Sequence, residues 1–243
     1  MLAIFKKELR SYFTSATGYI FLAVAMALLG AVFGATTFLR ASGETGSYFI
    51  FMLIILAIIL PILTMKIFSE EKRTKTEQLL LTAPVSVTRM VFGKYLAAFT
   101  MFMIVVVASM LNYIPLYAYT VKDAISTTMP PNFVMILGST FAIVLVGMCF
   151  IAIGMFISSL TENQFAAIVV TFGVLAGLLC ISLFNSYIPS AAVRGIFDWF
   201  SIYNRFYNFT YGLFDFGALI YYLSVAGVFV FLTIRVYEAR RYR

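Results

Sequence analysis

Charged residues in this chain fall into clusters, and long stretches between the clusters contain no Asp, Glu, Lys or Arg. These stretches cover residues 18–39, 45–65, 95–121, 124–161, 163–193 and 216–234. Each approaches or exceeds the roughly 20 residues that a helix needs to cross the hydrocarbon core of a bilayer. The pattern therefore predicts a multi-pass membrane protein.

The apolar stretches also indicate the fold class. They lack the strict alternation of transmembrane β-strands, and backbone groups in lipid must be hydrogen-bonded within their own segment, so helices remain. The composition agrees, since 63% of residues are hydrophobic, 11% are charged and the mean hydropathy is +1.00. We expect an all-α integral membrane protein that forms a single transmembrane domain over residues 1–243. The expected spans are residues 17–39, 47–67, 92–119, 132–160, 163–185 and 216–236.

Basic residues are divided unequally between the two ends of these spans. All but four of the 17 Lys and Arg residues fall at the end that carries both termini; the four are Arg40, Lys122, Arg194 and Arg205. Because short cytoplasmic loops are enriched in Lys and Arg, we expect both termini in the cytoplasm. A nucleic-acid partner is the weaker interpretation of the net charge of +7, because the charges are spread among the membrane boundaries.

Candidate catalytic chemistry is sparse. The chain contains no His, which removes the commonest metal ligand and general base. The cysteines Cys149 and Cys180 fall in apolar spans, where a thiol behaves as a small hydrophobic group. We expect no catalytic residue, metal site or cofactor on this chain.

Residues 1–16 are predicted to form an amphipathic helix on the cytoplasmic surface. The apolar positions Leu2, Phe5, Leu9 and Tyr12 recur at helical spacing, and basic residues fill the remaining face. The alternative is a frayed N-terminus that is merely basic.

Residues 68–88 form the most informative polar segment. Thr74 and Glu77 have the spacing of a capping box before three consecutive leucines, and Pro84 would end the resulting helix. A short helix with an exposed leucine face requires a partner. The alternative is a solvated loop whose charges only fix the topology.

The segment FSEEKRTKTEQLLLTAPVSVTRMVFGKYLA, residues 68–97, resembles the first cytoplasmic loop of ABC-2 type transporter permeases. A second match, ISSLTENQFAAIVVTF at residues 157–172, falls at the turn between the fourth and fifth spans. The six-span layout extends the resemblance over the whole chain, and the gliding-motility-associated permeases are the most similar subgroup. One departure is Lys75, where many relatives have Gly.

The resemblance implies a permease subunit of type V exporter-like architecture in the bacterial plasma (inner) membrane. It implies a complex of two permease chains, identical or different, with two ABC ATPase subunits that bind ATP and Mg, and an accessory periplasmic or membrane subunit can join them. ATP hydrolysis would then drive substrate export. No Gly-x-x-x-x-Gly-Lys-Ser/Thr motif occurs, because Gly93-Lys94 is followed by Tyr95, so the nucleotide must be bound by another chain.

Two cytoplasmic segments are assigned to the ATPase on this basis. The first is a coupling helix over residues 68–88, in which acidic groups pair with the ATPase and leucines fill an apolar cleft. Its assigned residues are Glu70, Glu71, Lys72, Glu77, Leu79, Leu80, Leu81 and Pro84. The second is the turn with Thr161, Glu162 and Gln164, where capping-box spacing also predicts the start of the fifth span.

Small-residue spacing predicts close helix packing at four glycines. Gly30 and Gly34 lie in the first span, and Gly173 and Gly177 lie in the fifth. The sequence leaves open whether these faces pack within one subunit or across a dimer.

Residues 187–215 are rich in aromatic residues and are predicted to form short helices at the outer membrane interface. Trp199, Tyr203 and Arg205 are candidates for interfacial anchoring, with substrate contact as the alternative.

A secondary transporter or channel, and a scaffold or mechanical element, are two alternative classes of function. A secondary transporter or channel should carry ionisable groups at mid-depth, and the spans contain none there. A non-transporting scaffold, or a mechanical element driven by the ATPase, would share every feature described above.

Overall fold

The computed structural model describes residues 1–38, 45–76, 86–115, 132–185, 194–195, 199 and 201–241. Its elements in this part of the chain are α-helices and one short π-helix, in agreement with the predicted all-α class. By length and composition, six helical stretches can cross a membrane. They are Ala16–Thr37, Gly46–Arg73, Val87–Pro115, Phe133–Leu160, Gln164–Ser182 and Phe216–Arg241.

The elements of the described residues follow in chain order. They are α1 (Leu2–Thr14), α2 (Ala16–Phe33), the π-helix η1 (Gly34–Phe38), α3 (Gly46–Thr64), α4 (Lys66–Arg73), α6 (Val87–Met110), α8 (Phe133–Leu160), α9 (Gln164–Asn185), α11 (Ile202–Thr210) and α12 (Phe216–Arg241).

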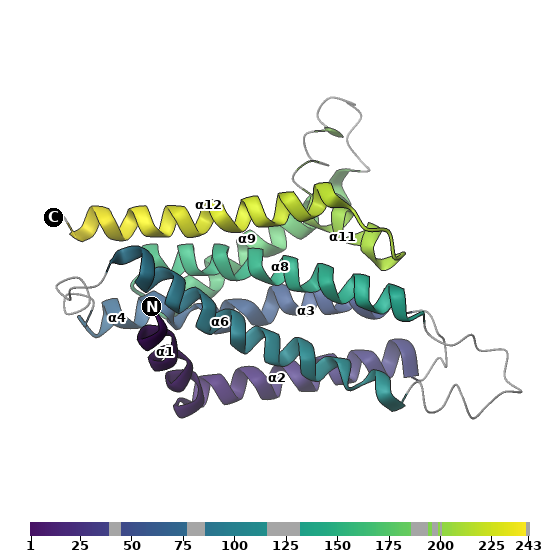
Figure 1. Cartoon of the computed structure of the whole chain (residues 1–243), viewed down its shortest axis with the longest axis horizontal. Coiled ribbons are helices and arrows are strands. Elements are labelled where there is room, and N and C mark those ends of the chain that lie inside the picture. The colour runs from purple at the N-terminus through teal and green to yellow at the C-terminus, as the bar shows by residue number, and fades with distance from the viewer. Residues whose placement is uncertain are drawn as a thin grey trace, which may run out of the picture.

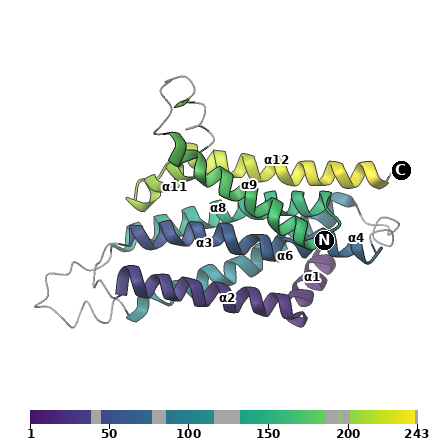
Figure 2. The ribbon, with the colours of Figure 1, turned by 180° about the vertical axis from the view of Figure 1, so that it is seen from behind.

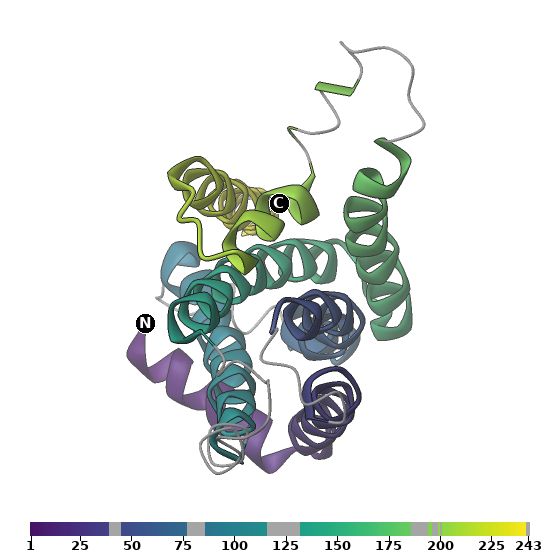
Figure 3. The ribbon, with the colours of Figure 1, turned by 90° about the vertical axis from the view of Figure 1, so that its right-hand side faces the viewer.

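Helix α8 forms the centre of the bundle. It contacts α3, α4, α6, α9, α11 and α12, and 72% of its most apolar window is buried. Viewed along the bundle, α8 lies between α12 on one side and α3 and α6 on the other (Figure 3). Helices α9 and α2 are peripheral, with only 17% and 28% of the corresponding windows buried. These two helices therefore present most of their apolar surface outward.

The two ends of the bundle differ in what they carry. Helices α1 and α4 lie at the end where the N- and C-termini are marked, and α11 lies at the opposite end (Figures 1 and 2). This arrangement matches the predicted grouping of both termini with the segment that follows the second span. Which end faces the cytoplasm stays a prediction.

Helix α1 is ordered by contact with the protein as well as by its amphipathic pattern. Ile4, Phe5 and Leu9 pack against the core, and Tyr12 is buried. At the turn into α2, Ser15 adopts an extended conformation, and a Cβ at Gly18 would lie 2.0 Å from the carbonyl oxygen of Tyr12. The elbow between α1 and α2 therefore requires glycine at position 18.

Close helix packing occurs at glycines other than those predicted. A Cβ added at Gly30, Gly34, Gly173 or Gly177 would meet no atom within 4 Å. A Cβ at Gly147 would lie 2.2 Å from the Phe102 ring, and one at Gly154 would lie 2.3 Å from the Thr64 hydroxyl and 2.9 Å from its Cβ. Within one subunit, close helix approach is therefore made by the α8 glycines Gly147 and Gly154. That the four predicted glycines pack against a second subunit stays a prediction.

Replacing Gly154 by Ala is expected to destabilise the protein by about 1–3 kcal/mol, because the new methyl group overlaps the stiff, β-branched Thr64. Thermal unfolding in micelles measures the effect. The matched control is Gly173→Ala, which adds the same methyl group to open space and is expected to be neutral or slightly stabilising. Equal unfolding temperatures for the two variants would contradict the packing described for α8.

Candidate functional site

A buried lysine joins three segments at the end of the bundle that carries the termini. Lys94, on α6, has a side chain only 2% exposed. Its ammonium lies 2.8 Å from a carboxylate oxygen of Glu71 on α4 and 3.1 Å from one of Glu8 on α1. We call Lys94, Glu8 and Glu71 the lysine triad.

The hydrogen-bonding capacity of Lys94 is fully used. Besides the two carboxylates, the ammonium donates to the backbone carbonyl of Ile67 at 3.0 Å, which accounts for its three N–H donors. The Phe68 ring lies 5.2 Å from the ammonium and adds a cation–π contact. A buried charge is tolerated when it is paired and hydrogen-bonded, and Lys94 meets both conditions.

Glycine at position 93 allows α1 to reach this lysine. A Cβ on Gly93 would lie 3.2 Å from a side-chain carbon of Ile4 and 3.4 Å from the carbonyl oxygen of Met1. The Gly-Lys pair at the start of the third span therefore has two structural roles. Glycine admits α1, and lysine binds the acidic residues of α1 and α4.

The break between α3 and α4 is capped by a side chain of α8. The Ser158 hydroxyl accepts hydrogen bonds from the backbone N–H groups of Phe68 and Ser69, both at 3.2 Å. It donates to the carbonyl of Met65, the residue between the two helices, at 3.0 Å. Ser158 is fully buried, so this one side chain supplies polar contacts that water would otherwise make.

The last turn of α8 attracts positive charge. The Ser159 carbonyl accepts hydrogen bonds from Lys72 on α4 and, at 3.1 Å, from Arg240 on α12. Cations at a helix C-terminus interact favourably with the helix dipole. Helices α4, α8 and α12 are thereby joined at the same end as the lysine triad.

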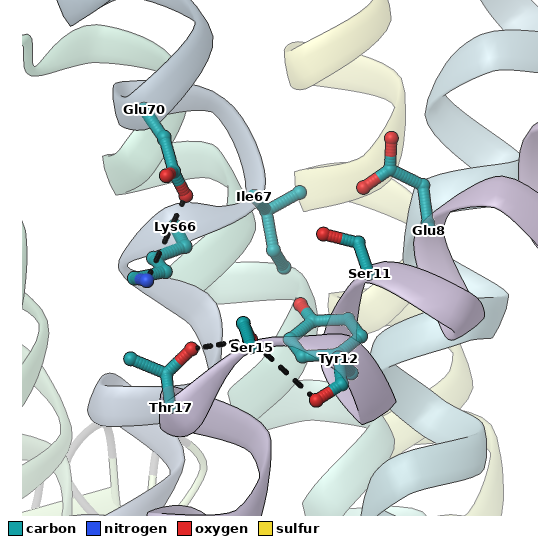
Figure 4. Close-up of a pocket in the computed structure, with 8 residues that line it drawn as sticks. All are labelled: Glu8, Ser11, Tyr12, Ser15, Thr17, Lys66, Ile67 and Glu70. Carbon is teal, nitrogen blue, oxygen red and sulfur yellow. Dashed lines mark hydrogen bonds and ion pairs between the residues drawn. The ribbon is translucent and has the colours of Figure 1, made fainter.

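Helix α1 also bonds to the end of α3 and lines a polar cavity together with α4. The Tyr12 hydroxyl donates to the Leu63 carbonyl at 3.3 Å, and burial, with smaller contributions from Glu8 and Glu70, raises the pKa of this tyrosine. Beside Tyr12 lies a cavity of about 70 Å³ (Figure 4). It is lined by Glu8, Ser11, Tyr12, Ser15, Thr17, Lys66, Ile67 and Glu70.

Three of the predicted coupling residues contact this protein itself. Glu71 was expected to pair with the ATPase, but it is mostly buried against Lys94, because the lysine lies inside the bundle and requires an anion there. Lys72 donates to the Ser159 carbonyl, and the half-exposed Glu70 lies 3.9 Å from Lys66. Glu77, Leu79, Leu80, Leu81 and Pro84 lie outside the described residues.

The capping-box prediction at Thr74 is wrong. Thr74 ends α4 rather than starting a helix, and its hydroxyl donates to the Glu70 carbonyl at 2.9 Å. The N–H groups of Lys75 and Thr76 then bond to the carbonyls of Lys72 and Glu71, as in a Schellman motif. Lys75 has φ of 57°, the left-handed conformation that favours glycine, which explains why glycine suits this position.

The second predicted capping box is also wrong, although a span does begin there. Thr161 is the C-cap of α8, and the side chain of Asn163 accepts a hydrogen bond from the Phe165 N–H at 2.9 Å and so caps α9. Glu162 is exposed, and Gln164 is the first residue of α9. A contact of this turn with an ATPase stays a prediction.

At the opposite end, α11 lies within the predicted interfacial segment. Ser201 caps it by accepting a hydrogen bond from the Asn204 N–H at 3.2 Å. Arg205 lies 4.5 Å from the Tyr221 ring of α12 and donates to the Trp199 carbonyl at 3.3 Å. Trp199 is 60% exposed, and Tyr203 stacks on Tyr207. Arg205 therefore holds α11 against α12, whereas anchoring in lipid and contact with substrate stay predictions.

Sequence reasoning missed the roles of Glu8, Lys94 and Ser158. One signal was present, because Lys94 falls inside the predicted third span, where a cation requires an anionic partner. No local signal identifies Ser158, since its contacts are with residues about 90 positions earlier. Within the described ranges, no three His, Cys, Asp or Glu side chains come together as they would around a metal ion.

Comparisons with known proteins agree with this architecture. The family model of the ABC-2 family transporter protein matches residues 35–236, which include all six helical spans in whole or in part. A comparison with curated proteins gives no match.

Removing the cation of the lysine triad is expected to be strongly destabilising. Lys94→Met leaves two carboxylates facing each other in a mostly buried site, and breaking a buried ion pair costs about 3–5 kcal/mol. The triple variant Lys94→Met, Glu8→Gln, Glu71→Gln removes the uncompensated charges and is expected to recover much of that loss. Unfolding of the purified chain in micelles measures all the variants.

The matched control for this experiment is Arg235→Met. Arg235 pairs with Glu238 at 3.0 Å, but its side chain is 64% exposed, so losing the pair is expected to cost less than about 1 kcal/mol. Equal losses of unfolding free energy in Lys94→Met and Arg235→Met would show that the lysine triad does not stabilise the protein as proposed.

Proposed function

The chain belongs to the ABC-2 transporter family, and on that premise we propose that it is the permease subunit of an ATP-driven exporter. A separate ABC ATPase binds ATP and Mg and hydrolyses the nucleotide in this proposed complex. The observation that carries it is the attachment of α4, which continues the second span and is held by the lysine triad and by Ser158. A helix fixed in this way can pass a displacement into the bundle.

The segment after α4 is the proposed contact with the ATPase. Helix α4 ends in the exposed turn Arg73, Thr74, Lys75 and Thr76, and the leucines at 79–81 follow directly. Glu71 and Lys72 bond to other parts of the permease, so the proposed ATPase contact consists of this turn and the leucines. Glu71 then acts by holding α4 in place.

Helix α8 provides the proposed route across the membrane. Its C-terminal turn contacts α4 through Ser158 and Ser159, and its 28 residues extend about 42 Å. Near its other end, the Ser139 hydroxyl donates to the Phe209 carbonyl of α11 at 3.5 Å. A movement of α4 would therefore reach α11, on the proposed exit side, through one continuous helix.

A second permease chain, identical or different, is part of the proposal. Helix α9 is the least buried span, and its glycines Gly173 and Gly177 face open space. An apolar cleft of about 310 Å³ lies between α3 and α9, with Phe172 and Tyr203 among its lining residues. These features favour a pairing surface on this side of the bundle.

The remaining assignments follow from the family and from the charge distribution. We propose two ATPase copies per complex, membership of the gliding-motility-like subgroup, and a bacterial inner membrane with both termini in the cytoplasm. The excess of Lys and Arg at the end that carries the termini supports this orientation.

Leu80→Ala is expected to weaken ATPase binding by about tenfold, since truncating one buried apolar anchor at an interface costs about 1–2 kcal/mol. The measurement is recovery of the cognate ABC ATPase when it is co-expressed with this chain and the permease is purified. The matched control is Leu213→Ala, a 64% exposed leucine in the turn that follows α11, which should leave recovery unchanged.

Full ATPase recovery and full transport in the Leu80→Ala variant would refute the proposed contact. Hydrolysis measured in liposomes separates the two forms of the function. Stimulation by a transported substrate supports export, whereas hydrolysis without any stimulation favours a mechanical element.

A further inference from the structure

The charges of α1 are sorted between the inside and the outside of the protein. Its only acidic residue, Glu8, is 17% exposed and is bound to Lys94. Its three basic residues, Lys6, Lys7 and Arg10, are all exposed. All the charged side chains on the outward surface of α1 are therefore cationic.

Apolar side chains border this cationic surface. Leu2, Lys6, Arg10 and Phe13 follow one another at spacings of four, four and three residues, so they form one stripe along the helix. Leu2 is 67% exposed and Phe13 is 38% exposed. Basic residues beside exposed apolar residues on one helix are typical of segments that lie in a membrane interface.

The position of α1 fits such an interface. It connects through the elbow at Gly18 to α2, the first span, and it crosses the end of the bundle rather than running parallel to the spans (Figures 1 and 2). The exposed stripe is thus held beside the first residues of the first span.

We propose that this stripe is a binding surface for anionic phospholipid. Lys6 and Arg10 in the stripe, together with the exposed Lys7 beside it, contact the phosphate groups of the headgroups, and Leu2 and Phe13 enter the acyl region. A phospholipid fits this surface because its phosphate complements the basic side chains and its acyl chains accept the exposed apolar ones. The attachment of α1 to a span keeps the surface near lipid. A free phosphate would not engage the apolar side chains.

Lipid binding on the outer face of α1 is connected to α4 through its inner face. Glu8 lies beside Lys7 in the sequence and bonds to Lys94, which in turn bonds to Glu71. Bound anionic lipid would therefore restrict α1 and, through the lysine triad, the helix that precedes the proposed ATPase contact. The binding surface itself does not depend on the proposed function.

The test uses the full chain in nanodiscs of phosphatidylcholine with an increasing fraction of phosphatidylglycerol, with the thermal unfolding temperature as the readout. Each basic residue near an anionic surface contributes about 1 kcal/mol, or about a fivefold change in binding. The variant Lys6→Gln, Lys7→Gln, Arg10→Gln should therefore bind the anionic lipid about a hundredfold more weakly and lose the stabilisation. The charge-preserving variant Lys6→Arg, Lys7→Arg, Arg10→Lys should keep it.

The matched control is Arg73→Gln, Lys75→Gln, Arg89→Gln, which removes three exposed cations near the same end. It should keep the response to phosphatidylglycerol. Equal loss of the response in both Gln variants would show an effect of net charge and overturn the proposal. An unchanged response of the α1 Gln variant to phosphatidylglycerol would also overturn it, whether or not that variant loses ATPase recovery. Equal stabilisation of the wild-type chain by inorganic phosphate at matched ionic strength would overturn it as well.

Discussion

The organisation of this protein at one end depends on a single buried ammonium group. Lys94 is removed from water, so it must be neutralised and hydrogen-bonded where it lies, and its partners come from sequence positions 8, 67 and 71. The need to satisfy this cation brings an N-terminal surface helix and the end of the second span onto the third span. Helix α1 is thus part of the folded bundle.

Helix α4 adds polar, directional contacts to the apolar packing of Ile67 and Phe68, whereas the contacts of the surrounding spans are mostly apolar. Apolar packing tolerates small sliding movements, but the Ser158 hydroxyl bonds to Met65 at the break and to the first turn of α4, and it would lose those bonds if α4 moved away from α8. Helix α4 and the end of α8 should therefore move as one unit. This property suits a segment that receives force from a partner and passes it to a helix long enough to reach the opposite end.

The sequence predicted the architecture well and the site less well, for physical reasons. Transmembrane helices are specified by long local runs of apolar residues, so the six spans and the helix at residues 2–14 could be located without tertiary information. The site depends on pairings between residues 23 to 93 positions apart, which no local pattern encodes. Charged residues in the 68–88 segment were predicted to pair with groups outside the chain, but Glu71 has its partner, Lys94, inside it.

Capping residues show the same limit at a smaller scale. Threonine followed three residues later by Glu or Gln fits a helix start, yet Thr74 and Thr161 both stand at helix ends, where their hydroxyls donate to carbonyls of the preceding turn. The motif spacing is compatible with either role. Only the conformation of the following residues decides between them, and at Asn163 the side chain adjacent to α9 makes the cap instead.

The left-handed turn after α4 has a consequence for partner recognition. Lys75 holds a conformation that costs a residue with a Cβ about 1–2 kcal/mol more than glycine, so the chain keeps a strained cation where an unstrained neutral residue would fit. The ammonium projects from an exposed turn together with Arg73. The local strain would be offset if a surface that receives this turn carried acidic side chains, and a complementary negative patch is therefore the feature to seek on the proposed ATPase.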